Sequence, residues 1–432
     1  MMYNPLSCDL LPMVEKHLDN RSQLMLYMAP LPVGTHFKSI QSWGYLHLHP
    51  RTVMFLCNRY ICPKMQLWDK FHEFYSAEEN ELLVQRTHEL FVDDNLKRHP
   101  LTYLTHFTNL KSLWLPNVTK ECLSKISTCV GLRELRISSM VLGSGCKNVY
   151  TQSQHKMFRH RMTGISKLRQ LELFCLAQSN VEKLTPLLGL PLRQIKLRNC
   201  TRIKTLKGIQ NSPLVSFEID TCSMLEDISL IPKVATLEWL SVNRCREVVT
   251  VPTFEPSNII KHLEFEASSI KTIDFLVNCR HLERLNLSLC EKVRDISVLE
   301  HCPKLLQLDI SETSVEDIEV VGKLQNLENL DLHECEFIQD ISPVQHCHSL
   351  VYLNLTGVGL LCDDESEYVA DFFTPLSGLR NLKRLILCIN HQIRGSIDLQ
   401  VTPMSAAYML KHMRIIDKQV HIIQTECWMH TK

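Results

Sequence analysis

The sequence has no excess of either charge. Its 47 lysines and arginines are balanced by 47 aspartates and glutamates, which gives a formal net charge of zero. Proteins that hold nucleic acids through a basic surface carry a clear positive excess. The composition therefore argues against nucleic acid as a partner, and any charged ligand must be recognised by a local surface.

Long apolar runs are also missing. The longest uncharged run near the N-terminus, residues 22–37, is too short to span a membrane and contains Pro30 and Pro32. The first apolar stretch is interrupted by Asp9 and Glu15, which a secretory signal would not carry. These absences predict an intracellular protein, cytoplasmic or nuclear, with no membrane partner.

The motifs of common enzyme classes are absent as well. The chain has no Walker loop, no Gly-x-Ser-x-Gly and no His-Glu-x-x-His. Cys57 and Cys62, followed by His72, lack the second ligand pair that a zinc site of this spacing needs. We therefore expect no catalytic residues, no cofactor and no metal, and we predict that the protein is not an enzyme.

What the chain does contain is an internal repeat of the form L-x-x-L-x-L. Between Leu192 and Leu350 the successive starts are 22 or 23 residues apart. A period of this length with this pattern is typical of leucine-rich repeats. The units start at Leu110, Leu132, Leu168, Leu192, Leu214, Leu237, Ile260, Leu282, Leu305, Leu327, Leu350, Leu382 and Leu410, and a fainter unit starts at Thr87 with Leu90, Val92, Leu104 and Phe107 in phase.

A single unit of this size cannot bury its own apolar side, so the units must stack on one another. The repeated leucines point inward, and the residues between them face outward from a parallel sheet on the concave side. Such short repeats leave room for extended segments and 3₁₀ turns but for few α-helices. The predicted fold class is α/β, a leucine-rich repeat solenoid or horseshoe with a small, mainly helical N-terminal cap.

Half of the 18 cysteines recur at fixed places in the repeat. Such regularity is typical of small buried apolar groups, so we expect reduced thiols in the core. A metal column with nearby histidines such as His281 and His301 is the alternative. The positions are eight residues after a start for Cys200, Cys222, Cys245, Cys290 and Cys335, and three residues before a start for Cys129, Cys279, Cys302 and Cys347.

The repeat resembles the cysteine-containing class of leucine-rich repeats. The unit of that class reads L-x-x-L-x-L-x-x-C, then Ile/Val-x-Asp, then a second Cys, and residues 282–305 match it except for about one missing helical turn. The Asp-Ile pairs are similar to those of trypanosome leucine-rich repeat proteins and of protein phosphatase 1 regulatory subunits. They begin at Asp227, Asp295, Asp317 and Asp340. This last resemblance implies regulation of a phosphatase as one candidate function.

The periodicity also divides the chain. We predict a capping or F-box-like domain over residues 1–86, the solenoid over 87–416, and a C-terminal cap over 417–432. Two intervals between repeat starts, of 36 and 32 residues, are longer than the others. Insertions in solenoids form loops, so we place a basic insertion at 141–164 and an acidic one at 361–376.

The N-terminal leucines suggest an alternative to a simple cap. Leu10, Leu11, Val14 and Leu18 line one face of a predicted helix. This stretch resembles the opening of an F-box, a helical module that often precedes cysteine-type leucine-rich repeats. The resemblance implies that these four residues hold a ubiquitin-ligase adaptor. An ordinary amphipathic cap explains the same leucines.

The concave face is where we expect function. From Leu214 to Leu350 its outward positions are mainly acidic, whereas those of the earlier units are mixed to basic. Aromatic side chains among charges are typical anchors of protein interfaces. We therefore predict a protein-interaction scaffold whose partner carries a basic segment, with an F-box-like substrate receptor and a phosphatase regulatory subunit as alternatives. The predicted partner-binding residues are Trp114, Phe174, Glu218, Asp220, Trp239, Glu264, Glu266, Asp309, Asp331 and Tyr352.

Overall fold

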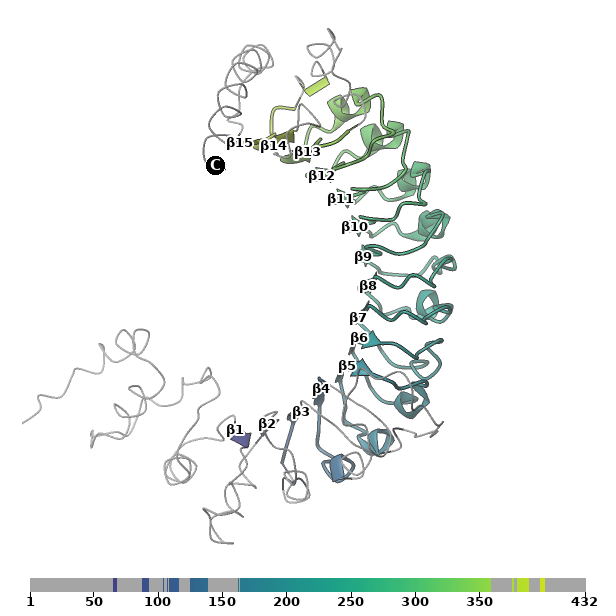
Figure 1. Cartoon of the computed structure of the whole chain (residues 1–432), viewed down its shortest axis with the longest axis vertical. Coiled ribbons are helices and arrows are strands. Elements are labelled where there is room, and N and C mark those ends of the chain that lie inside the picture. Colours follow the sequence, from purple (N-terminus) through teal and green to yellow (C-terminus); the bar gives the residue numbers. More distant parts are fainter. Residues whose placement is uncertain are drawn as a thin grey trace, which may run out of the picture. The chain divides into compact units, whose positions relative to one another are not determined.

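A computed structural model (Figure 1) describes residues 65–67, 88–92, 104, 107, 109–115, 125–138, 162, 164–358, 375–376, 379–387 and 397–400. The chain divides into two compact units. Unit 1 comprises Met1–Ser138 and Thr163–Leu171, and unit 2 comprises Ser139–Met162 and Glu172–Lys432. Each unit is described below by itself.

Four short strands in the described part of unit 1 pair in parallel in chain order. They are β1 (Met65–Leu67), β2 (Glu89–Val92), β3 (Ser112–Leu115) and β4 (Glu134–Ile137), and a 3₁₀ helix, η4 (Ile165–Lys167), follows. The fainter unit predicted at Thr87 is thus present as β2. Strand β1 lies within residues 1–86, whereas Leu10, Leu11, Val14 and Leu18 lie outside the described residues.

The described part of unit 2 contains one strand for each repeat, β5 to β14, and one further strand, β15. The strands are β5 (Leu173–Ser179), β6 (Gln194–Cys200), β7 (Ser216–Asp220), β8 (Trp239–Asn243), β9 (His262–Glu264), β10 (Arg284–Asn286), β11 (Gln307–Asp309), β12 (Asn329–Asp331), β13 (Tyr352–Asn354), β14 (Arg384–Leu387) and β15 (Ile397–Gln400). Strands β5 to β14 pair in parallel in chain order, and β15 pairs antiparallel with β14.

In unit 2 the strands line the inner, concave side and 3₁₀ helices lie on the outer side (Figure 1). These helices are η5 (Thr185–Leu187), η6 (Ile231–Lys233), η7 (Asp274–Asn278), η8 (Ser297–His301), η9 (Glu319–Lys323) and η10 (Ser342–His346). The predicted solenoid with short, irregular outer segments is therefore confirmed.

The strand register follows the sequence period. Gln194 pairs with Ser216, Ser216 with Trp239, and Trp239 with His262, so the partners are 22, 23 and 23 positions apart. The apolar residue that follows each partner points inward; Phe217 and Leu263, for example, are both 0% exposed. Stacking removes this apolar surface from water, which is the main force that holds such a solenoid together.

One part of the predicted register is wrong. Phe174 was expected on the outward face, but it is fully buried. Leu171, Phe174 and Leu176 are the inward residues of this repeat, so the unit starts at Leu171 rather than Leu168. The error arose because the L-x-x-L-x-L letters fit the chain from Leu168, which is also buried, whereas from Leu171 the fourth position is Phe174.

The interval of 32 residues is confirmed, because Tyr352 of β13 pairs with Arg384 of β14. The antiparallel strand β15 was not predicted, since it lies outside the repeat pattern. The insertions at 141–164 and 361–376 are described only at residues 162, 164, 375 and 376, and the proposed C-terminal cap lies outside the described residues.

The cysteines have the structural role that their spacing predicts. Nine of the ten described cysteines are buried, and all ten are free thiols. Burial raises the pKa of Cys302 and of Cys347 to about 12, so both stay protonated. Cys290 Sγ donates to the carbonyl of Phe265 at 2.9 Å, and Cys335 Sγ to that of Ile310 at 3.1 Å. A thiol thus joins each of these repeats to the preceding one.

The residue directly before the cysteine that follows each of these strands has a left-handed backbone conformation, and the chain turns into the core there. Thr221, Arg244 and Glu334 have φ of 54°, 53° and 53°. The backbone N–H of Arg244 donates to the carbonyl of Glu266 in the next repeat at 2.8 Å. The inter-repeat hydrogen bonding therefore continues where the regular strand ends.

The Asp-Ile pairs start the outer segments. Oδ1 of Asp227, Asp295, Asp317 and Asp340 accepts the backbone N–H two residues ahead, at 2.9, 2.7, 2.7 and 2.7 Å respectively. Hydrogen bonds from Ser297 lower the pKa of Asp295. The motif that resembles other short leucine-rich repeats thus acts as a local cap at the turn into each outer segment.

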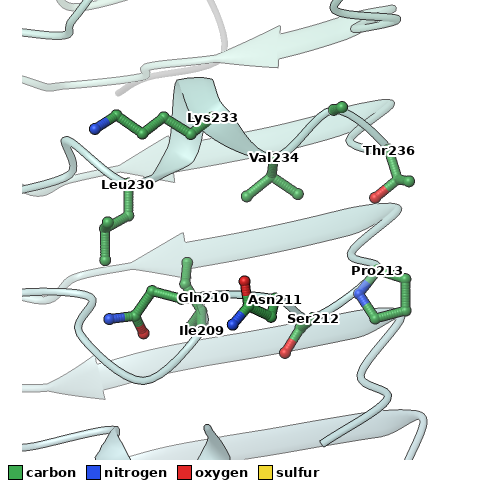
Figure 2. A pocket seen from close by; sticks show the side chains of 10 residues that line it. Ile209, Gln210, Asn211, Ser212, Pro213, Leu230, Lys233, Val234 and Thr236 are labelled. Carbon is green, nitrogen blue, oxygen red and sulfur yellow. The ribbon is translucent and has the colours of Figure 1, made fainter. Parts of the chain in front are cut away.

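One pair of outer segments is separated by a shallow cavity. Gly208 has a φ of 127°, and a Cβ there would lie 2.1 Å from the carbonyl oxygen of Leu184, so this segment lies close against the preceding repeat. On its other side, a cavity of about 380 Å³ separates it from the next outer segment, which contributes Leu230, Lys233 and Thr236 (Figure 2).

Candidate functional site

The outward positions of β8 to β13 form two rows across the strands. The first row is Trp239, His262, Arg284, Gln307, Asn329 and Tyr352, and the second is Ser241, Glu264, Asn286, Asp309, Asp331 and Asn354. Most of these residues line a shallow groove of about 450 Å³. This groove, within unit 2, is the candidate site.

The structure brings together half of the predicted binding residues. Trp239, Glu264, Asp309, Asp331 and Tyr352 all line the groove. Their roles as binding residues remain a prediction.

The other predicted residues lie elsewhere. Trp114 belongs to unit 1, is 37% exposed, and donates from Nε1 to Oγ of Ser138 at 2.8 Å. Phe174 is part of the core. Glu218, Asp220 and Glu266 lie on the same sheet face as the groove but do not line it.

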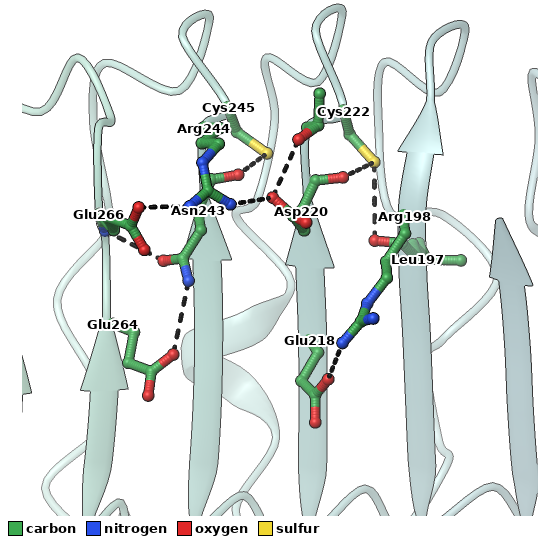
Figure 3. A network of polar contacts seen from close by, with 11 residues as sticks. Leu197, Arg198, Glu218, Asp220, Cys222, Asn243, Arg244, Cys245, Glu264 and Glu266 are labelled. Carbon is green, nitrogen blue, oxygen red and sulfur yellow. Dashed lines mark hydrogen bonds and ion pairs between the residues drawn. The ribbon is translucent and has the colours of Figure 1, made fainter. Parts of the chain in front are cut away.

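Those three acids, which we call the paired set, are neutralised within the fold (Figure 3). Glu218 forms ion pairs with Lys196 and with Arg198, the latter at 3.6 Å. Arg244 lies between the other two carboxylates and pairs with both, at 3.0 Å in the case of Asp220. These cations belong to neighbouring repeats, so the pairs tie the repeats together.

Glu264, Asp309 and Asp331 differ, and we call them the unpaired set. Among the described residues no ion pair joins them to a cation. Glu264 is approached by Nδ2 of Asn243 at 3.5 Å. Asp331 Oδ2 accepts from the Tyr352 hydroxyl at 3.1 Å. Neutral donors leave the negative charge in place, so this stretch of the face carries the acidic excess.

Asp309 is the most enclosed of the three. Its Oδ1 accepts from the backbone N–H and the hydroxyl of Ser311, at 3.0 and 2.6 Å. Burial raises the pKa of Asp309 despite these bonds, and the nearby carboxylates of Asp331 and Glu266 raise it further. Ionisation of Asp309 therefore lowers the stability of the folded state.

Aromatic side chains stand at the two ends of the groove. At one end the rings of Trp239 and His262 are 4.8 Å apart, and Trp239 Nε1 and His262 Nδ1 are buried with no hydrogen-bond partner in the described part of the chain. Burial lowers the pKa of His262, which favours the neutral ring. At the other end the Arg384 guanidinium lies 5.5 Å from the Tyr352 ring centroid.

The sequence analysis did not single out the amides of the groove. Asn286, Gln307 and Asn329 line it together with Arg284. Neutral amides carry neither of the two signals, charge and aromatic rings, from which the binding residues were predicted. Over the described ranges, no cluster of three or more metal-binding side chains is present. No described helix has the length and apolar character to cross a membrane.

No protein-family model matches the chain, and no curated protein sequence matches it. Among solved structures it is similar to an internalin, InlF, from Listeria monocytogenes, with a TM-score of 0.51 and 20% identity over 66% of this chain and 76% of that one. It is also similar to the functional domain of InlJ from the same organism, described as including a cysteine ladder. That TM-score is 0.50 at 15% identity, and the match covers 73% of this chain and 61% of the other. These similarities show the fold, which is that of leucine-rich repeat proteins.

Proposed function

We propose that the protein is a non-enzymatic scaffold that binds a partner protein in the groove of β8 to β13, through a basic segment of that partner. The observation that carries the proposal is the unpaired set. Among the described residues no ion pair joins Glu264, Asp309 or Asp331 to a cation, while acids on the adjoining strands are paired. A charge that the fold leaves uncompensated on an accessible face is available to a ligand of opposite charge.

The dimensions of the groove suit a polypeptide. Neighbouring strands are about 4.8 Å apart, so the five steps from Trp239 to Tyr352 cover about 24 Å. An extended chain of about seven residues has that length. The amides in the first row offer donors and acceptors to a backbone, and the terminal aromatics resemble the anchors that dominate binding energy at interfaces. Curved solenoids commonly bind partners on this side.

The test compares two matched triple variants of the full chain. One changes Glu264, Asp309 and Asp331 to Lys. The control changes Glu247, Glu316 and Glu336 to Lys, which makes the same charge change at exposed positions that do not line the groove.

Each variant and the wild type serve as bait in quantitative affinity purification, and recovered candidates are then retested as purified proteins. We expect the groove variant to lose, by at least tenfold, partners that the control retains. Both variants should unfold at the wild-type temperature to within a few degrees. Equal recovery by the two variants would contradict the proposal.

A further inference from the structure

We propose that Trp239, His262 and Arg284 form a site for the C-terminal carboxylate of the partner's basic segment. This inference rests on the proposed function, and it assigns the end of that segment to the part of the groove built by β8 to β10. The three residues occupy the same register position on these successive strands, and all three line the groove.

Two of the residues hold a nitrogen atom without a partner. Trp239 Nε1 and His262 Nδ1 are buried, and neither has a hydrogen-bond partner in the described part of the chain. A buried polar atom without a partner lowers the stability of the fold. A phenyl ring would bury similar apolar surface without that loss. Two unsatisfied nitrogens on rings whose centroids are 4.8 Å apart therefore indicate a common acceptor that a ligand supplies.

Both nitrogens can donate to such an acceptor. An indole N–H only donates. Burial, and next the charge of Arg284, lower the pKa of His262, which favours the neutral ring. A neutral imidazole carries its proton on one nitrogen, so a bound acceptor selects the Nδ1–H form. The terminal torsion of an aromatic side chain has a broad minimum, so a modest rotation turns each N–H toward the groove.

Arg284 supplies the positive charge that a carboxylate needs. Two other arginines of this sheet face, Arg198 and Arg244, pair with acids of neighbouring repeats. Arg284 is exposed, and among the described residues no ion pair or side-chain hydrogen bond engages it. A planar guanidinium binds a carboxylate through two parallel N–H groups. One cation and two neutral donors on neighbouring strands thus face one position in the groove.

The surroundings favour a C-terminal carboxylate over other anions. Glu264 follows His262 by two residues, so a doubly charged phosphate or a segment with several acids would be repelled more strongly than one carboxylate. A basic segment that ends a chain still carries one carboxylate. Three strand steps separate β9 from β12, about 14 Å, which is the length of about four extended residues. Basic side chains at that distance from the C-terminus would reach Asp331.

The experiment uses three fluorescent eight-residue peptides of alternating lysine and threonine, labelled at the N-terminus. The first ends in a free carboxylate and the second in an amide. The third has glutamate as its last residue, followed by an amide. Binding to the full chain is followed by fluorescence anisotropy. We expect the free acid to bind roughly tenfold more tightly than the amide, and the glutamate peptide to bind like the amide.

Three variants of the full chain show which residues read the carboxylate. Arg284→Gln should lower the affinity for the free acid roughly tenfold and leave that for the amide nearly unchanged. Trp239→Phe keeps an aromatic ring and removes the N–H, so it should reduce the preference for the free acid roughly threefold. Arg280→Gln is the control, because it makes the same change at an exposed arginine that does not line the groove. It should retain the full preference.

Melting temperatures separate lost binding from lost folding. Arg284→Gln and Trp239→Phe should melt within a few degrees of the wild type, because neither the Arg284 guanidinium nor the Trp239 N–H has a partner among the described residues. The comparison of free acid and amide on the wild-type chain needs no variant, so it decides the outcome even if a variant unfolds.

Several results would overturn the carboxylate site. They are equal binding of the free acid and the amide, binding of neither, binding of the glutamate peptide as tight as that of the free acid, and an unchanged preference in Arg284→Gln or Trp239→Phe. In each case the scaffold proposal stands as long as the triple lysine variant loses its partners, and it fails only if that variant retains them.

Discussion

Two stretches of one sheet face differ in whether their acidic side chains form ion pairs with cations of the protein. In the paired set, Glu218, Asp220 and Glu266 each meet a cation from a neighbouring repeat. In the unpaired set, the hydrogen bonds that the carboxylates of Asp309 and Asp331 accept from described residues all come from neutral groups. The first arrangement links repeats and is complete without a ligand. The second arrangement leaves the carboxylate charges without a cation from the described part of the chain.

The difference arises from what stands at the neighbouring register positions. Lys196 is the direct register partner of Glu218, so the pair forms when the strands align. The positions beside Asp309 in its own row hold Asn286 and Asp331, neither of which supplies a cation. The same repeat geometry therefore produces a self-neutralised surface or an acidic one, depending on a few residues.

The largest expected effect on the free energy of unfolding comes from replacing a residue that lies in the core and not on the outward face. Phe174→Ala should lower the free energy of unfolding by about 3–5 kcal/mol, because a fully buried ring is lost. Trp114→Ala, at a 37% exposed position, should cost clearly less. Urea unfolding of the full chain checks both. Equal losses would mean that face and core are not separable in this way.

A capping carboxylate should show a smaller effect. Asp295→Ala removes the acceptor for the Ser297 N–H and should cost about 1 kcal/mol or less, since the position is exposed. The folded pKa of Asp295 is lowered, so its stabilisation is present above the unfolded pKa and is lost as the pH falls through the folded pKa. Asp295→Asn, which keeps an acceptor, is the control, and chemical denaturation at neutral and at acidic pH gives both numbers.

Removing the cation of the paired set should leave its acids without ion pairs, as in the unpaired set. Arg244→Gln leaves Asp220 and Glu266 without their shared cation. The loss in unfolding free energy should be about 0.5–1 kcal/mol at low salt, because these groups are partly exposed, and should shrink in high salt through screening. Thermal unfolding at two ionic strengths measures it. A loss that does not depend on salt would show that the contribution of Arg244 is not electrostatic.

The smallest effect has the opposite sign. Asp309→Asn should stabilise the fold at neutral pH by roughly 0.5 kcal/mol, since it removes a costly charge and keeps the Oδ1 acceptor. A raised folded pKa means that the contribution of Asp309 is favourable below the unfolded pKa and is lost as the pH rises through the folded pKa. The gain should therefore disappear in acid. Melting curves at neutral and acidic pH decide this, and a neutral-pH loss of stability would contradict it.

The sequence predicted the repeat period, the inward leucines and the buried cysteines, because each depends only on spacing along the chain. It predicted the wrong start at Leu168, because the L-x-x-L-x-L letters fit from that buried leucine, while the repeat that starts at Leu171 has Phe174 in the fourth place. The antiparallel strand β15 gave no periodic signal. Ion pairing on the face was missed because it depends on which side chains meet across strands, and counting acids along the chain does not show this.

The central claim is that the unpaired set serves binding and the paired set serves stability. The most direct test neutralises each set in the full chain: E264Q with D309N and D331N, and E218Q with D220N and E266Q. Partner affinity and unfolding free energy are measured for both variants. The account predicts that the first variant loses binding at undiminished stability, and that the second loses stability but retains binding. Loss of binding by the second variant alone, or by neither, would contradict it.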